Sequence, residues 1–166
     1  PHLAEENEFV SMFLDEARIA SRIQHPNVVQ IFELGEQEDE LFFAMEYLQG
    51  ENLADVMKSI ALDGGQPSLA QMAYIIARTA TGLHAAHELR GHDGETLGLV
   101  HRDVSPHNVF ITYDGAVKLL DFGIAKATGR LSKTATGELK GKYAYMAPEQ
   151  LLSSHNVDRR ADIFSL

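Results

Sequence analysis

Polar residues in the second half of the chain have types and spacings that suit metal binding and proton transfer. They are His101-Arg102-Asp103, Asn108, Asp121-Phe122-Gly123 and Ala147-Pro148-Glu149. Asp103 and Asn108 bracket a short loop between two predicted strands, and Asp121 closes the next strand after the hairpin turn signal Asp114-Gly115. Because a hairpin brings both strand ends to one place, we expect two carboxylates and an amide oxygen to converge.

An all-oxygen set with two carboxylates suits a magnesium ion that is shared with substrate phosphates rather than enclosed by protein alone. One carboxylate can then remain free of the metal and act as a base. A pair of polar β-turns would explain any one of these tripeptides. Polar turns explain poorly why all of these motifs occur together in this order and spacing. We therefore favour a catalytic site.

A predicted helix over residues 8–23 places a carboxylate among apolar side chains. Its apolar stripe consists of Phe9, Met12, Phe13, Ile19, Ala20 and Ile23. Glu16 falls in the middle of this stripe, and a buried carboxylate is costly unless a cation or hydrogen-bond donors meet it. We therefore expect Glu16 to have such a partner. The alternative is an edge position from which the side chain extends into solvent.

Other patterns predict the elements that position these groups. They are strands over 28–34 and 41–47, a short helix over 52–62, and a long loop from about 123 to 145. A second helix begins with Ser68 as N-cap and Gln71 three residues later, a capping-box pattern, and extends to about Leu89. Its His84 and His87 resemble a ligand pair, but we favour packing or surface roles because no acidic partner motif accompanies them.

The composition is typical of a soluble globular protein, with 45% apolar and 23% charged residues among 166. Zero cysteines exclude disulfides, thiolate zinc sites and cysteine nucleophiles, and no apolar run reaches membrane-spanning length. The net charge of −10 is uneven, because residues 1–57 carry −11 and residues 58–166 carry +1. A basic stretch over 126–142 could meet phosphate or an acidic peptide, but charge alone favours the alternative of a solvated loop. It has too few aromatic residues and no module for nucleic acid.

The ordered polar set resembles the eukaryotic-like (Hanks-type) serine/threonine protein kinases of bacteria. His101–Asn108 match the family's HRD-x-x-x-x-N pattern, Asp121–Gly123 match DFG, and Ala147–Glu149 match APE. The resemblance covers essentially all 166 residues. It implies ATP and Mg²⁺ as cofactors and transfer of the γ-phosphate to Ser/Thr hydroxyls of a protein substrate.

The same resemblance implies an α+β fold with two lobes, present here in part. We expect residues 1–45 to form an N-lobe portion that includes the predicted helix, 46–50 the hinge, and 51–166 a C-lobe portion with the catalytic loop and activation segment. It further implies a cytoplasmic kinase domain, no membrane contact within this segment, and self-association that would allow trans-autophosphorylation.

Several residues match functional positions of the family. Asp103 resembles the catalytic base, Asn108 and Asp121 resemble the Mg²⁺ ligands, and Glu16 matches a glutamate that pairs with an ATP-holding lysine. The remaining matches to the ATP site are the gatekeeper Met45, the hinge residues Glu46 and Leu48, and Phe110 beneath the adenine. Asp162 matches an aspartate that anchors the catalytic loop from a buried helix.

The chain departs from the family pattern beside the base. The family usually has Lys where this chain has Ser105, and Thr where it has Lys142. We hypothesise a swap in which Lys142 supplies the missing cation; the alternative is an exposed lysine beside a tolerated serine. Arg102 matches an arginine that binds a phosphate on the activation segment, for which Thr134 and Thr136 are the favoured acceptors.

The chain starts on Pro1 and stops on Leu166 within an apolar stretch, so we expect a fragment of a larger kinase domain. We expect the glycine-rich loop and the strand lysine of the family to lie outside these 166 residues, and we therefore expect this chain alone to transfer little phosphate. The alternative to an enzyme is a non-catalytic protein, either a pseudokinase-like scaffold or a truncated kinase remnant.

If Lys142 replaces the usual lysine, the change Lys142→Ala in the full-length protein will slow phosphoryl transfer. The physical reason is the loss of a cation that stabilises charge developing on the phosphoryl group. Steady-state rates with a protein substrate measure the effect. An unchanged rate would show that Lys142 is an exposed lysine without this role.

Overall fold

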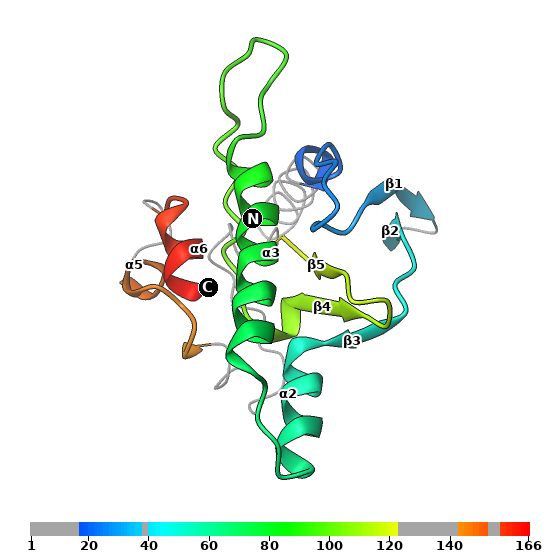
Figure 1. The fold of residues 1–166 in the computed structure, drawn as a ribbon. Helices are drawn as coiled ribbons and strands as arrows, with labels where there is room; N and C mark the ends of the chain where they lie inside the picture. Colours follow the sequence, from blue (N-terminus) through cyan, green and yellow to red (C-terminus); the bar gives the residue numbers. More distant parts are fainter. Residues whose placement is uncertain (1–16, 38–39, 123–142, 153–156) are drawn as a thin grey trace.

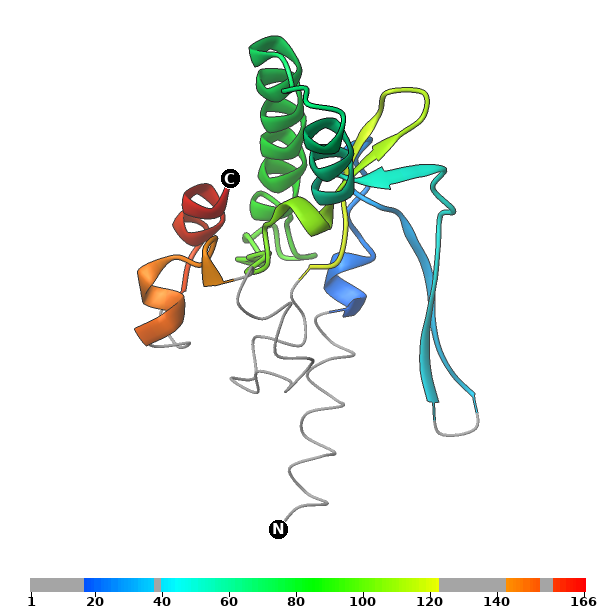
Figure 2. The same cartoon turned by 90° about the horizontal axis from the view of Figure 1, so that it is seen from below.

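The computed structural model describes residues 17–37, 40–122, 143–152 and 157–166 (Figures 1 and 2). In chain order the elements are β1 (Ile31–Gln37), β2 (Glu40–Met45), β3 (Gly50–Asn52), α2 (Leu53–Leu62), α3 (Leu69–His87), the 3₁₀ turn η1 (Pro106–Asn108), β4 (Val109–Thr112), β5 (Val117–Leu119), α5 (Pro148–Leu152) and α6 (Arg160–Ser165). Helices and strands are thus mixed, and the predicted α+β fold is confirmed.

The strands form two antiparallel sheets. β1 pairs with β2 in a two-stranded ribbon, with Gly35 opposite Phe42. β3, β4 and β5 form a second sheet in that order, in which Phe110 lies opposite both Asn52 and Lys118. The β4–β5 hairpin turns at Gly115, whose φ of 87° lies in the left-handed region that glycine adopts freely. The predicted Asp114-Gly115 turn is therefore confirmed.

Helix α3 is the central element of the structure. It lies between α6 on one side and the sheet of β3, β4 and β5 on the other (Figures 1 and 2). The predicted capping box is present, because Ser68 Oγ accepts from the Gln71 N–H at 3.2 Å and Gln71 Oε1 accepts from the Ser68 N–H at 2.9 Å. The helix ends at His87, two residues before the predicted end at Leu89.

One hydrophobic core joins α3 to both strand-bearing parts of the chain. Its buried members are Ala20, Ile23, Val28, Leu53, Leu83, Ala86, Val104, Val109, Val117, Leu119 and Phe122. Leu83 and Leu119 are fully buried where α3 meets β5. The loop that carries the polar set is thus attached to the most densely packed part of the structure.

Asn27 fixes the N-terminal segment against the second sheet. Its side chain donates to the Val117 carbonyl at 2.8 Å and accepts from Thr81 Oγ1 at 3.0 Å. Its own carbonyl accepts from the Leu119 N–H at 2.9 Å, and the Val29 N–H donates to the Leu119 carbonyl at 2.9 Å. These bonds connect the first part of the chain to β5 and α3 at once.

Further element boundaries differ from prediction, and the strand predicted over 41–47 is observed as β2 over Glu40–Met45. The predicted strand over 28–34 is observed as β1 from Ile31, because Val28 and Val29 pair with Leu119 instead of β2. The described part of the predicted helix over 8–23 is helical over 17–20 and turns at Ser21. Among the described helices, none is long and apolar enough to cross a membrane.

Gly82 permits the close approach of α3 to Asn27. A Cβ at this position would lie 2.6 Å from the Asn27 carbonyl oxygen, a backbone atom that cannot move independently. We predict that Gly82→Ala in the full-length protein lowers the free energy of unfolding by about 1 to 3 kcal/mol. Denaturant or thermal melts measure it.

Helix propensity alone predicts that Gly82→Ala raises the free energy of unfolding, since alanine is favoured over glycine inside a helix by about 1 kcal/mol. An unchanged or raised stability of Gly82→Ala would therefore contradict the close approach.

Candidate active site

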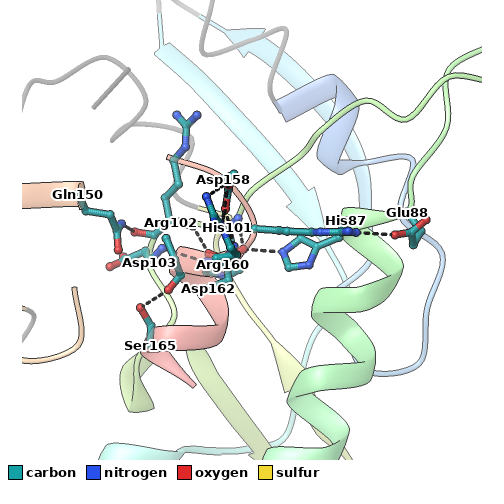
Figure 3. A network of polar contacts seen from close by, with 12 residues as sticks. His87, Glu88, His101, Arg102, Asp103, Gln150, Asp158, Arg160, Asp162 and Ser165 are labelled. Carbon is teal, nitrogen blue, oxygen red and sulfur yellow. Dashed lines mark hydrogen bonds and ion pairs between the residues drawn. The ribbon is translucent and has the colours of Figure 1, made fainter. Parts of the chain in front are cut away.

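The buried carboxylate of Asp162 is the centre of the polar network in Figure 3. Asp162 lies in α6 and is 1% exposed. Its Oδ2 accepts from the His101 N–H at 2.8 Å and from His87 Nε2 at 2.7 Å, and its Oδ1 accepts from the Arg102 N–H at 2.8 Å. One side chain therefore holds two consecutive backbone amides of the loop and the end of α3. The position of Asp162 agrees with the anchoring role that the resemblance implies.

Arg102 has a backbone conformation that this network must maintain. Its φ is 63°, in the left-handed region that side chains other than glycine adopt at a cost of about 1 to 3 kcal/mol. Asp162 holds its N–H, and Gln150 Nε2 donates to its carbonyl at 2.9 Å. The Arg102 backbone is thus held from both sides, directly before Asp103.

His101 connects the loop to the segment that carries Asp121. Its buried ring donates from Nε2 to the Leu120 carbonyl at 2.8 Å, and its Nδ1 accepts from the Asp103 N–H at 3.2 Å. Its ring lies 4.6 Å from that of Phe122 between centroids. Burial lowers the pKa of His101 below the ordinary 6.5, although Asp162 and the Leu120 carbonyl act in the opposite direction. The ring is therefore neutral at pH 7, as its two hydrogen bonds require.

The structure brings Asp103 and Asn108 into direct contact. Asn108 Nδ2 donates to the Asp103 carbonyl at 2.7 Å and to its carboxylate Oδ2 at 2.9 Å. The Leu120 N–H donates to the Asn108 carbonyl at 2.8 Å, which places Asp121 at the adjoining end of β5. Asp121 has a φ of 36° and its side chain is exposed. The hairpin of β4 and β5 therefore brings the three polar residues to one edge.

The donor set fits a magnesium ion that is completed by phosphate. Because Asn108 uses its Nδ2 toward Asp103, its side-chain oxygen is directed elsewhere, and the Asp121 carboxylate is open to solvent. The described residues contain no group of three or more His, Asp or Glu side chains placed for a metal. Asn108 and Asp121 would thus hold Mg²⁺ together with phosphate oxygens and water, the arrangement that Mg²⁺ favours.

The residues expected at the adenine lie on neighbouring elements. Met45 ends β2 with 43% of its surface exposed, Leu48 is half-buried, and Phe110 lies half-buried in β4. The Glu46 carboxylate instead accepts from the Gln30 N–H at 2.8 Å and pairs with Lys118 at 2.5 Å. The side chain of Glu46 therefore joins Gln30, directly before β1, to β5. Since the Glu46 N–H also donates to the Gln30 carbonyl at 2.9 Å, only the Glu46 carbonyl could serve a nucleotide.

Several predicted residues are outside the described part of the chain, namely Glu16, Lys142, Thr134 and Thr136. Ser105, which stands where the family has lysine, is 3% exposed. Within the described residues, its Oγ and the Nε of Arg102 are buried without a hydrogen-bond partner.

Two polar residues that support the site were not predicted. The sequence pattern points to His87 but not to its partner, which lies 75 residues further along the chain. A glutamine at the third position of a helix, as Gln150 is in α5, is a recognisable capping signal. That signal predicts the bond to the Ala147 N–H but not the bond to Arg102.

The sequence is similar to known protein kinases over nearly its whole length. The model of the family described as "Protein kinase domain" matches residues 2–166. Tyrosine-protein kinase MasK of Myxococcus xanthus is 49% identical over 166 residues, which are all of this chain and 26% of that protein. Serine/threonine-protein kinase PrkC of Bacillus subtilis is 34% identical over 163 residues, 98% of this chain and 23% of that protein. The chain thus spans about a quarter of these relatives.

The fold is similar to that of a solved bacterial kinase domain. The crystal structure of the Mycobacterium tuberculosis PknI kinase domain matches with a TM-score of 0.70 and 30% sequence identity. The match covers 93% of this chain and 52% of that domain. A partial kinase fold, as expected from the sequence, is therefore confirmed.

The lowered pKa of His101 predicts a loss of stability in acid. Above pH 6.5 the ring is neutral in both the folded and the unfolded protein, and the full stability is present. Below it, the unfolded chain binds a proton that the folded protein resists, so the free energy of unfolding falls by up to about 1.4 kcal/mol per pH unit. His101→Gln in the full-length protein removes this contribution.

Denaturant melts between about pH 7.5 and about pH 5.5 measure the two slopes. The wild type should lose more stability than His101→Gln across this interval. Equal slopes would show that the ring titrates as freely in the folded protein as in the unfolded one.

Proposed function

Because the chain belongs to the protein kinase family, we propose that its parent protein transfers the γ-phosphate of ATP to serine and threonine hydroxyls of protein substrates. The observation that carries the proposal is the contact of Asp103 with Asn108, beside a backbone that Asp162 fixes. This arrangement presents a carboxylate base next to oxygen ligands for a metal. The parent enzyme is the subject of the proposal, since the chain spans about a quarter of the relatives reported above.

In the proposed reaction Asp103 accepts the proton of the substrate hydroxyl as that oxygen attacks the γ-phosphorus. Asn108 and Asp121 would hold Mg²⁺, which when bound together with ATP neutralises phosphate charge and orients the group that is transferred. The Asn108 amide keeps the Asp103 carboxylate in one orientation through its bond at 2.9 Å. The chain thus contributes chiefly position and electrostatics, which are the main sources of catalysis in phosphoryl transfer.

Further residues complete the proposed site. Glu16 would pair with a lysine of the preceding N-lobe, and the backbone of Glu46 and Leu48 would bind adenine between Met45 and Phe110. Lys142 would supply a cation near Ser105, which stands where the family usually has lysine. Arg102 would bind a phosphate on Thr134 or Thr136, and its side chain has a buried Nε without a described partner.

Tyrosine phosphorylation is the second candidate function. It is favoured by the printed name of the 49% identical relative, a tyrosine-protein kinase, and by Ser105 in place of the lysine usual in serine/threonine kinases. Specificity for serine and threonine is supported by Pro106, which follows the pattern of serine/threonine kinases, and by relatives such as serine/threonine-protein kinase PrkC. The non-catalytic alternative has less support, because Asp103, Asn108 and Asp121 are all retained.

We predict that full-length protein with Mg²⁺ and ATP phosphorylates serine and threonine in a mixed peptide library, as read by mass spectrometry. Asp103→Asn removes the base and should lower the rate by about 100- to 10,000-fold. Asp121→Asn removes a charged metal ligand and should raise the Mg²⁺ concentration needed for activity. Asp63→Asn, the same change at the exposed C-cap of α2, is the matched control and should leave the rate unchanged.

Phosphate found only on tyrosine would contradict the proposed serine/threonine specificity and would support tyrosine phosphorylation instead. A wild-type protein that binds ATP yet transfers nothing would support the non-catalytic alternative, as would equal rates for wild type and Asp103→Asn.

A further inference from the structure

We propose that Gln150 is a positioning residue for Asp103, an inference that rests on the function proposed above. Gln150 connects the start of α5 to the backbone of the catalytic loop. Its Nε2 donates to the Arg102 carbonyl at 2.9 Å (Figure 3), and its Oε1 accepts from the Ala147 N–H at 3.0 Å. Gln150 and Arg102 lie 48 residues apart in the sequence, so the bond joins separate segments.

The two partners fix the orientation of the amide. The Ala147 N–H requires an acceptor and therefore the amide oxygen, while the Arg102 carbonyl requires a donor and therefore the amide nitrogen. If the amide were reversed, its oxygen would face the Arg102 carbonyl and its nitrogen would face the Ala147 N–H, and neither hydrogen bond could form. A side chain with only one of the two functions can therefore satisfy only one end of the connection.

The bond to Arg102 reaches the peptide unit directly before Asp103. Asp162 already holds the N–H of Arg102 at 2.8 Å, but this bond does not fix the peptide plane on the other side of the residue. That peptide is held at both of its polar groups: the Asp103 N–H donates to His101 Nδ1 at 3.2 Å, and the Arg102 carbonyl accepts from Gln150 at 2.9 Å. The Gln150 bond is the shorter of these two restraints beside Arg102, whose φ is 63°. Rotation of the Arg102–Asp103 peptide would turn the Asp103 carboxylate away from its position beside Asn108.

At its other end, the Gln150 side chain binds the buried residue that precedes α5. Ala147 is fully buried and precedes Pro148, the first residue of α5. Gln150 at the third helical position caps the N-terminus of α5 through the Ala147 N–H. Gln150 thus couples the position of α5, at the end of the activation segment, to the orientation of the proposed base.

A purely structural role as a helix cap is the alternative, and Gln150→Glu separates the two. A glutamate at this helical position keeps the acceptor for Ala147 and suits a helix N-terminus. The glutamate side chain has no N–H to donate to the Arg102 carbonyl, and its negative charge would repel that carbonyl oxygen. The change therefore preserves the cap and breaks the connection to the catalytic loop.

Gln71→Glu is the matched control. Gln71 has the same capping position in α3, where its Oε1 accepts from the Ser68 N–H at 2.9 Å, and it is exposed. Full-length wild type, Gln150→Glu and Gln71→Glu are compared by kcat, by KM for ATP and by melting temperature. Gln150→Lys, which can donate to Arg102 but cannot accept from Ala147, completes the series.

We expect Gln150→Glu to lower kcat by about 10- to 100-fold, with KM for ATP changed by less than about twofold, because the base is misplaced while the nucleotide site is intact. Its melting temperature should match that of Gln71→Glu, and Gln71→Glu should keep the wild-type kcat. Gln150→Lys should retain more kcat than Gln150→Glu although it loses the cap.

An active wild type with an unchanged kcat in Gln150→Glu would overturn this inference and leave the proposed function intact. A loss of kcat in Gln150→Glu that follows a lowered melting temperature, with Gln150→Lys equally impaired, would likewise assign Gln150 to the cap alone. A wild type without phosphoryl transfer would overturn the proposed function and this inference with it.

Discussion

The geometry of the catalytic loop depends on one buried carboxylate that accepts three hydrogen bonds. A charge taken out of water is tolerated only when donors replace its hydration. Asp162 meets this condition with two backbone amides and a histidine ring. Those bonds define the left-handed turn at Arg102 and the position of His101, whose ring in turn contacts Phe122. The burial of one side chain thus fixes the backbone that leads to Asp103.

The supports of the site come from elements that are distant in sequence. α3 contributes His87, α6 contributes Asp162, and α5 contributes Gln150. Asn108 ends η1 directly before β4, and the β4–β5 hairpin leads to Asp121. A central helix that contacts both sides is the simplest way to hold these parts together, and α3 has this position (Figure 2). The supports of the loop therefore converge on α3 and the buried core around it.

The sequence predicts what short-range chemistry determines, and much less of what long-range pairing determines. The Ser68 capping box and the Asp114-Gly115 turn depend on residues within four positions, and both are observed. The ordered polar motifs predicted the family and the partial two-lobed fold, which the comparisons confirm. The start of β1 was displaced because Asn27 binds Val117, 90 residues away, and no local pattern encodes such a partner. The roles of the motif residues, the domain boundaries and the partner of Glu16 stay predictions.

The late position of Asp162 has a consequence for how the protein is made. His101 is synthesised 61 residues before the carboxylate that holds its amide. Ribosomes add roughly 5 to 20 residues per second, so the loop waits several seconds in a nascent chain for α6 to emerge. During this interval the proposed base and the proposed metal ligands are present without their scaffold. The order of translation thus delays assembly of the site until α6 has been made.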